Sequence, residues 1–192
     1  MKENINILKK LSNEEKKIFN SLQNEGPITK SEISRLTKIK LTTLNNTMEI
    51  LEKKRIIVRE AIGQSTGGRR PVLYDVNLLE FYIIGIDISR VYTQVIITNL
   101  KMEILYKEMF NMDIFCSPQE TVKRIYEIVN NANQSLKLAN WNLVGIGLGT
   151  VGPLDIKNGI MISPVNFSSL GWSNVPIKEK LKIFIINIFK CI

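Results

Sequence analysis

The side chains of this sequence that are best suited to chemistry are polar and basic ones that lie before residue 75. Small hydroxyl and amide groups in one helical pattern can meet base edges when a helix enters the major groove of DNA. Lysines just before that pattern can hold phosphates, and arginines that follow glycines can enter a minor groove. The candidates for reading base edges are Thr42, Thr43, Asn45 and Asn46. The candidates for holding phosphates are Lys38 and Lys40, and the candidates for the minor groove are Gly67, Gly68, Arg69 and Arg70.

Two short helices and a hairpin are predicted to position these side chains. Thr29 and Glu32 have the spacing of a reciprocal capping box, and a second helix follows with Leu44, Met48 and Leu51 on its core face. An earlier capping box, Ser12 with Glu15, opens a supporting helix. Residues 56–58 and 71–74 read as strands on either side of the glycine-arginine tip. A solvated helix pair would explain the helices alone, but the two arginines serve no core, so we predict a winged helix-turn-helix over residues 1–76.

Charge supports this assignment and limits the alternatives. The net charge is +8, and residues 1–75 hold 15 Lys and Arg against 9 Asp and Glu, as a phosphate-binding module requires. No amphipathic helix carries the dense basic face that a membrane surface would need. Cys116 and Cys191 are far apart in a chain without histidine, so neither a zinc site nor a disulfide framework is predicted. No secretory signal or membrane-spanning run is recognisable, and we expect a cytoplasmic protein.

The remainder, residues 81–192, has the pattern of an α/β domain. Apolar runs at 81–88, 91–98 and 104–112 predict an antiparallel meander of three strands. A helix from Ser117 to about Leu138 and a buried strand over 143–148 follow, with a short strand at 160–164 and a short helix at 175–182.

A glycine repeat, Gly145, Gly147 and Gly149, stands at the end of the predicted strand over 143–148. A dinucleotide-binding fingerprint would have to open a helix there, whereas Pro153, Asp155 and the residues after them indicate a turn. We therefore expect a loop of closely approaching backbone that suits a small polar ligand. A tight turn without a ligand explains the same residues equally well.

Taken together, these segments resemble the ROK family of sugar-responsive repressors and sugar kinases, on the repressor side. The matching features are the winged helix-turn-helix, the wing STGGRRP, the strand end GIDIS, the turn GIGLGTVGPLD and the loop NFSSLGW. The likeness covers about residues 12–182, and within the family it points to repressors of xylose-utilisation operons. The resemblance implies that the second domain is the first, incomplete lobe of an actin-like ATPase (ribonuclease H-like) fold, so the chain combines α+β and α/β parts.

The resemblance also implies a sugar site and a departure from the kinases. By position, Gly149 and Asn166 would line the sugar pocket. The kinases have glycines after the aspartate that ends the first strand, whereas Asp87 is followed here by Ile88, Ser89 and Arg90. Close approach to ATP phosphates therefore looks blocked, and we expect no enzyme activity. The family's zinc motif and catalytic Asn-Asp pair have no counterpart in this sequence, so we expect no cofactor and a truncated or frame-shifted gene product.

The sequence thus predicts a repressor of a sugar-utilisation operon, with xylose as the candidate sugar. Its expected partners are double-stranded operator DNA, a sugar effector and a second copy of the chain, without a membrane. Because the domain is expected to be incomplete, we predict weakened operator affinity and little or no sugar response. The alternatives are a ROK-type sugar kinase relative and a degenerate, non-functional fragment of a repressor.

Overall fold

The computed structural model describes residues 7–62, 71–138 and 142–188, and the chain divides into two compact units. The first unit runs to Tyr82 and includes two later segments, Asn99–Glu103 and Asn142–Val144. The second unit consists of Ile83–Thr98, Ile104–Trp141 and Gly145–Ile192. The turn at residues 99–103 is therefore part of the first unit, although the strands on both sides of it belong to the second.

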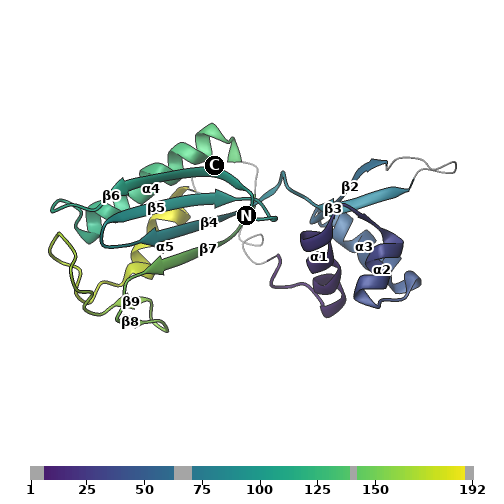
Figure 1. Ribbon diagram of the computed structural model, residues 1–192, viewed down its shortest axis with the longest axis horizontal. Coiled ribbons are helices and arrows are strands. Elements are labelled where there is room, and N and C mark those ends of the chain that lie inside the picture. Colours follow the sequence, from purple (N-terminus) through teal and green to yellow (C-terminus); the bar gives the residue numbers. More distant parts are fainter. Residues whose placement is uncertain (1–6, 63–70, 139–141, 189–192) are drawn as a thin grey trace. The chain divides into compact units, whose positions relative to one another are not determined.

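Three helices and a small antiparallel sheet form the first unit (Figure 1). The helices are α1 (Asn13–Glu25), α2 (Lys30–Thr37) and α3 (Leu41–Lys53). The strands are β1 (Ile28–Thr29), β2 (Ile57–Ile62) and β3 (Val72–Val76), in the order β1-β3-β2. The predicted helices and hairpin strands are confirmed, whereas the two-residue strand β1 was not predicted.

Both predicted capping boxes are confirmed. The Ser12 hydroxyl accepts a hydrogen bond from the backbone N–H of Glu15, and the Glu15 carboxylate accepts one from the backbone N–H of Ser12 at 2.7 Å. Thr29 and Glu32 make the same reciprocal pair at the start of α2. Each box satisfies backbone donors that a helix leaves without intrahelical partners, so the sequence determines where these helices begin.

The core of the first unit consists of apolar side chains that recur at helical spacing. Ile18, Leu22, Ile33, Leu44 and Met48 are fully buried, together with Leu51. The predicted core face of α3 is confirmed. In α2, Ile33 is the buried residue, and Leu36 remains 44% exposed.

The turn at residues 99–103 completes this core. Leu100 is 1% exposed within the same cluster, and its carbonyl accepts a hydrogen bond from the Gln23 amide at 2.6 Å. The Lys101 ammonium forms an ion pair with the Asp75 carboxylate and donates to the Gly26 carbonyl at 2.7 Å. Asp75 is buried, so its negative charge depends on this one lysine for compensation.

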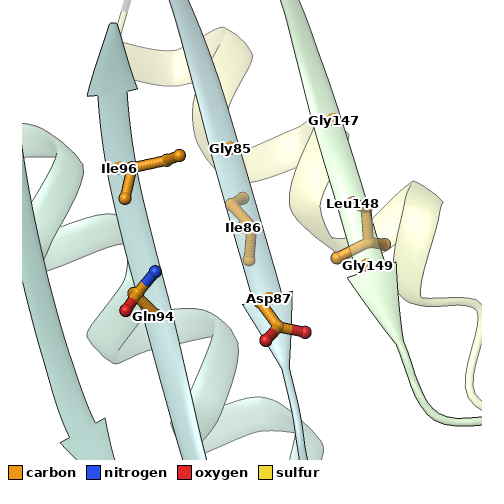
Figure 2. Close-up of a pocket in the computed structure, with 8 residues that line it drawn as sticks. All are labelled: Gly85, Ile86, Asp87, Gln94, Ile96, Gly147, Leu148 and Gly149. Carbon is orange, nitrogen blue, oxygen red and sulfur yellow. The ribbon is translucent and has the colours of Figure 1, made fainter. Parts of the chain in front are cut away.

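The second unit is built on a four-stranded sheet in the order β6-β5-β4-β7. Its strands are β4 (Phe81–Ile88), β5 (Tyr92–Thr98), β6 (Ile104–Asn111) and β7 (Asn142–Thr150). β4, β5 and β6 pair antiparallel, for example Ile86 with Val95, which confirms the predicted meander. β7 lies beside β4 and runs in the same direction (Figure 2).

Helices cover one face of this sheet. α4 (Pro118–Ser135) and α5 (Ile177–Ile188) pack against each other on that face (Figure 1). Ile84, Ile86 and Ile88 are buried in β4, whereas Gly85 and Asp87 between them are only partly covered. This alternation follows from the two-residue period of a strand, so the odd-numbered residues of β4 lie on the other face.

The segment after β7 differs from its prediction. The predicted strand over 143–148 is confirmed and contains Gly145 and Gly147, but as β7 it continues through Gly149 to Thr150, so the expected loop at Gly149 is wrong. Pairing with β4 overrides the local tendency of glycine to mark turns. The chain turns only afterwards, through β8 (Leu154–Asp155) and β9 (Ile160–Met161). β9 is shorter than the predicted strand, and α5 is longer than the predicted helix.

Candidate nucleic-acid interface

The polar face of α3 is exposed as a continuous surface. Leu44, Thr47 and Met48 are buried on one side of this helix, and the candidate base-reading residues lie on the other. Thr47 is not part of that surface because it is buried, and its hydroxyl donates to the Thr43 carbonyl at 2.9 Å. The structure thus places all four predicted base-reading residues on the exposed face of α3: Thr42, Thr43, Asn45 and Asn46.

Two lysines directly precede α3. Lys38 ends α2 with a left-handed backbone (φ 60°), and Lys40 is the N-cap of α3. Ile39 between them is 9% exposed, and its carbonyl accepts a hydrogen bond from the Ser34 hydroxyl at 2.7 Å. Because Ile39 anchors the turn, the two neighbouring lysines are directed to the surface, where both are exposed.

The N-terminus of α3 is open to an anion. Lys40 makes no side-chain hydrogen bond to the first turn of the helix, and that turn contains no acidic residue. Unsatisfied backbone N–H groups and the positive end of the helix dipole favour a phosphate at such a position. Among the described residues, no carboxylate lies within ion-pair distance of Lys38 or Lys40.

Several carboxylates of the first unit are occupied elsewhere. Glu52 accepts two hydrogen bonds from the Arg59 guanidinium, at 2.6 and 3.2 Å. Glu15 accepts from the Lys54 ammonium at 2.5 Å. Burial alone would raise the pKa of Glu15, but the hydrogen bonds from Lys54 and Ser12 outweigh it, and the pKa is lowered. These acids are therefore neutralised by their own partners and do not oppose an anion at α3.

The predicted wing tip lies outside the described residues. Gly67, Gly68, Arg69 and Arg70 belong to the segment 63–70. The described part of the hairpin is the antiparallel pair of β2 and β3, from Ile57 opposite Val76 to Ile62 opposite Val72, with an irregularity between Glu60 and Ile62. Entry of the arginines into a minor groove remains a prediction.

One residue of this surface was missed in the sequence. Lys30, the first residue of α2, donates a hydrogen bond from its ammonium to Oδ1 of Asn45 at 2.8 Å. The same ammonium lies 5.3 Å from the ring centroid of Tyr74 in β3. Its positive charge was the only signal in the sequence, because the contact joins residues 15 positions apart on different helices.

The second unit has an open hollow of about 410 Å³ on the sheet face away from the helices (Figure 2). Gly85 and Asp87 of β4, Gln94 and Ile96 of β5, and Gly147 and Gly149 of β7 contribute to its lining. A Cβ atom added to Gly149 would lie 3.4 Å from a carboxylate oxygen of Asp87, so the two strands approach closely here.

The structure does not bring the two predicted sugar-binding residues to one place. Gly149 lines the hollow, whereas Asn166 is not among its lining residues. Asn166 is exposed and has a left-handed backbone (φ 63°). Its loop is held by the Arg90 guanidinium, which donates to the Val165 carbonyl at 2.8 Å, and by stacking of Phe167 on Trp172 with 4.6 Å between ring centroids.

A sequence profile of the ROK family matches residues 83–185, which is more than half of the chain. The chain belongs to the ROK family. A second profile, for winged helix-turn-helix DNA-binding, matches residues 15–58 of the first unit. The predicted fold class is thereby confirmed, with a winged helix-turn-helix followed by part of a ROK domain.

Several relatives of this ROK chain are named xylose repressors. The xylose repressor of Caldicellulosiruptor bescii is 30% identical over 79% of the chain and 37% of the relative. The xylose repressor of Bacillus subtilis is 24% identical over 88% of the chain and 42% of the relative. The chain thus spans about two fifths of the length of the curated relatives that it matches.

A solved structure supports the fold of this ROK chain. The crystal structure of a ROK family transcriptional regulator, a homolog of the Escherichia coli Mlc protein, aligns with a TM-score of 0.61. The alignment covers 88% of the chain and 42% of that structure at 14% identity. At this identity the likeness shows a shared fold.

The described residues show neither a cluster of metal ligands nor a membrane-spanning helix. Within the described ranges, no group of three or more His, Cys, Asp or Glu side chains is placed to hold a metal ion. None of the described helices has the length and apolar character needed to cross a membrane.

Proposed function

We propose that this ROK chain is a DNA-binding transcriptional repressor of a sugar-utilisation operon, and that the sugar is xylose. The observation that carries the proposal is the exposed polar face of α3, whose N-terminus has no side-chain cap and directly follows the exposed Lys38 and Lys40. Thr42, Thr43, Asn45 and Asn46 would read bases from that face, and the two lysines would hold phosphates. Arg69 and Arg70 would enter the minor groove.

Relatives support the biological role. The proteins from C. bescii and B. subtilis are named xylose repressors, and the aligned solved structure is named a transcriptional regulator. A repressor of this kind would bind operator DNA near the genes that it controls. Since two half-sites are usually read at a fixed spacing, we propose that the chain binds as a homodimer in the cytoplasm.

A non-enzymatic role is supported by the turn after Asp87. The Ser89 backbone N–H donates to the Tyr92 carbonyl at 2.9 Å, and the Ser89 hydroxyl accepts from the backbone N–H groups of Val91 and Tyr92 at 3.3 and 3.2 Å. These backbone N–H donors already make hydrogen bonds within the turn, so they are not available to bind a phosphate group. We therefore propose that the chain does not transfer phosphoryl groups, in contrast to a sugar kinase.

The sugar site is proposed at the hollow of the ROK domain. Its volume of about 410 Å³ is within the usual range for small-molecule sites, and Asp87 and Gln94 offer polar groups there. Gly149 would contact the sugar in this hollow, whereas Asn166, which does not line it, has no part in the proposed site.

Nuclease protection on the DNA upstream of the gene would test the repressor proposal. We expect a protected site, and we expect xylose to change its protection more than glucose, the control sugar, does. Protection of no site would contradict the proposal. An assay of ATP turnover with xylose would test the kinase alternative, and turnover that requires Asp87 would favour it.

A further inference from the structure

Lys30 and Asn45 form a paired unit on the DNA-facing surface of the first unit. Lys30 begins α2, Asn45 lies on the exposed face of α3, and their side chains are joined by a hydrogen bond of 2.8 Å. We propose that this pair makes the chain selective for guanine at one position of its operator. The inference rests on the proposed function and specifies which base that surface reads.

The contact determines the orientation of the Asn45 amide. An ammonium group has three donors and no acceptor, so the amide atom that faces Lys30 has to be the oxygen. The amide nitrogen, with its two N–H donors, then points away from Lys30. Asn45 therefore presents its two N–H donors away from Lys30, and one of the two lone pairs of its oxygen is already engaged.

The lysine is held in place by a third element. Its ammonium lies 5.3 Å from the ring centroid of Tyr74, and that tyrosine is only 4% exposed within β3. A cation near an aromatic ring is attracted by its negative face. The ammonium of Lys30 is thus held by Asn45 of α3 and by Tyr74 of the sheet.

Base-edge chemistry then favours guanine over adenine. Guanine presents two acceptors, O6 and N7, in the major groove, whereas adenine presents one acceptor and the N6 amino donor. Asparagine normally recognises adenine with both amide atoms, and the oxygen accepts from N6. Here one lone pair of that oxygen is engaged by Lys30, and the adenine amino group would approach the oxygen next to a positively charged donor, whereas both guanine acceptors are attracted to it.

The pair gains importance when DNA excludes water. In the free protein, an exposed hydrogen bond of this kind contributes little to stability. In a groove, the lower effective dielectric strengthens the interaction between the ammonium and the guanine acceptors. The expected consequence is a difference in base preference, with little change in folding.

Selection from a randomised duplex pool, followed by binding titrations on guanine and adenine versions of the selected site, would test the proposal. Four proteins are compared: the unmodified chain, Lys30→Met, Asn45→Ala and the control Lys38→Met. We expect Lys30→Met to reduce the preference for guanine over adenine by roughly tenfold or more at one position. Asn45→Ala should weaken discrimination at the same position.

The control separates base reading from phosphate binding. Lys38→Met should lower affinity for all duplexes equally and leave the base preference intact. If Lys30→Met behaves in that same uniform way, Lys30 holds a phosphate and the inference is overturned. If the unmodified chain selects no sequence at all, the proposed function itself fails. Circular dichroism of each variant would verify that the helices are intact.

Discussion

Charged side chains in the first unit have defined partners, and Glu15 illustrates this most clearly. Its carboxylate serves the capping box of α1 and also accepts from Lys54, the C-cap of α3, so one residue joins the start of one helix to the end of another. The pair is largely buried on the acid side, with 7% of the Glu15 side chain exposed. Replacing the carboxylate should therefore affect the stability of the whole unit.

We predict that Glu15→Gln lowers the free energy of unfolding by about 1–3 kcal/mol at neutral pH, because a charged hydrogen bond is lost. The pKa of Glu15 is lowered in the folded state from its ordinary value of 4.5. Its contribution is therefore present above that value and is lost as the pH falls through the lower, folded pKa. Urea denaturation from pH 7 down to pH 3 should show the difference from the unmodified chain shrinking.

Glu14→Gln is the matched control, since Glu14 is exposed in the same helical turn. We expect it to have little effect at any of these pH values. A constant difference between Glu15→Gln and the unmodified chain across the pH range would contradict the role assigned to the carboxylate.

Cys116 is expected to be unreactive in the native protein. Burial raises the pKa of its thiol, and its side chain is 0% exposed. Because the thiolate is the nucleophile, a buried and protonated thiol reacts slowly. Alkylation followed by peptide mapping should modify Cys116 at least about tenfold more slowly in the folded chain than in urea. Equal rates in the two conditions would show that the thiol is accessible.

Local sequence patterns predict the elements better than they predict the contacts between them. The capping boxes of α1 and α2 and the apolar face of α3 are visible in the sequence because they involve residues within one or two helical turns. The contact of Lys30 with Asn45 and the packing of Leu100 on the winged unit depend on distant residues. No periodicity in the sequence encodes them.

Glycine was the main source of error in the candidate sugar site. Gly145 and Gly147 were correctly placed in a strand, but Gly149, which was expected in a loop, belongs to the same strand, and the small residues leave an open hollow beside Asp87. The polar loop around Asn166 was recognised, yet its distance from that hollow could not be predicted. Its position depends on contacts with Arg90 and with the carbonyl of Cys116, which lie far away in the sequence.

Removing the charge of Lys101 is expected to destabilise the first unit. In Lys101→Met, the Asp75 carboxylate, whose side chain is 3% exposed, would lose its cation. Leaving a buried charge without its partner costs about 3–5 kcal/mol in the free energy of unfolding. Urea denaturation followed by circular dichroism would measure the loss.

Lys107→Met, an exposed lysine on β6, serves as the control and should change stability by less than about 0.5 kcal/mol. Adding Asp75→Asn to Lys101→Met should recover part of the loss, because the buried charge is then removed. If the two lysine variants were equally stable, the ion pair would have no structural role.

For the whole molecule, the distribution of charge predicts how binding depends on salt. Lys38 and Lys40 are both exposed and free of ion pairs within the described part of the chain. Replacing either by methionine should weaken binding to every duplex and reduce the slope of log affinity against log salt by about 0.9. Lys123→Met, on α4 of the ROK domain, should leave the slope unchanged.

The most direct test of a sequence-specific repressor is a titration of the chain on its own upstream DNA and on a random duplex of equal length. We predict a preference of roughly a thousandfold for the upstream DNA at physiological salt, with steep weakening as salt rises. Asn46→Ala should reduce that preference while random binding is kept. Equal affinity for both duplexes would contradict the account, because α3 would then contact phosphates without reading bases.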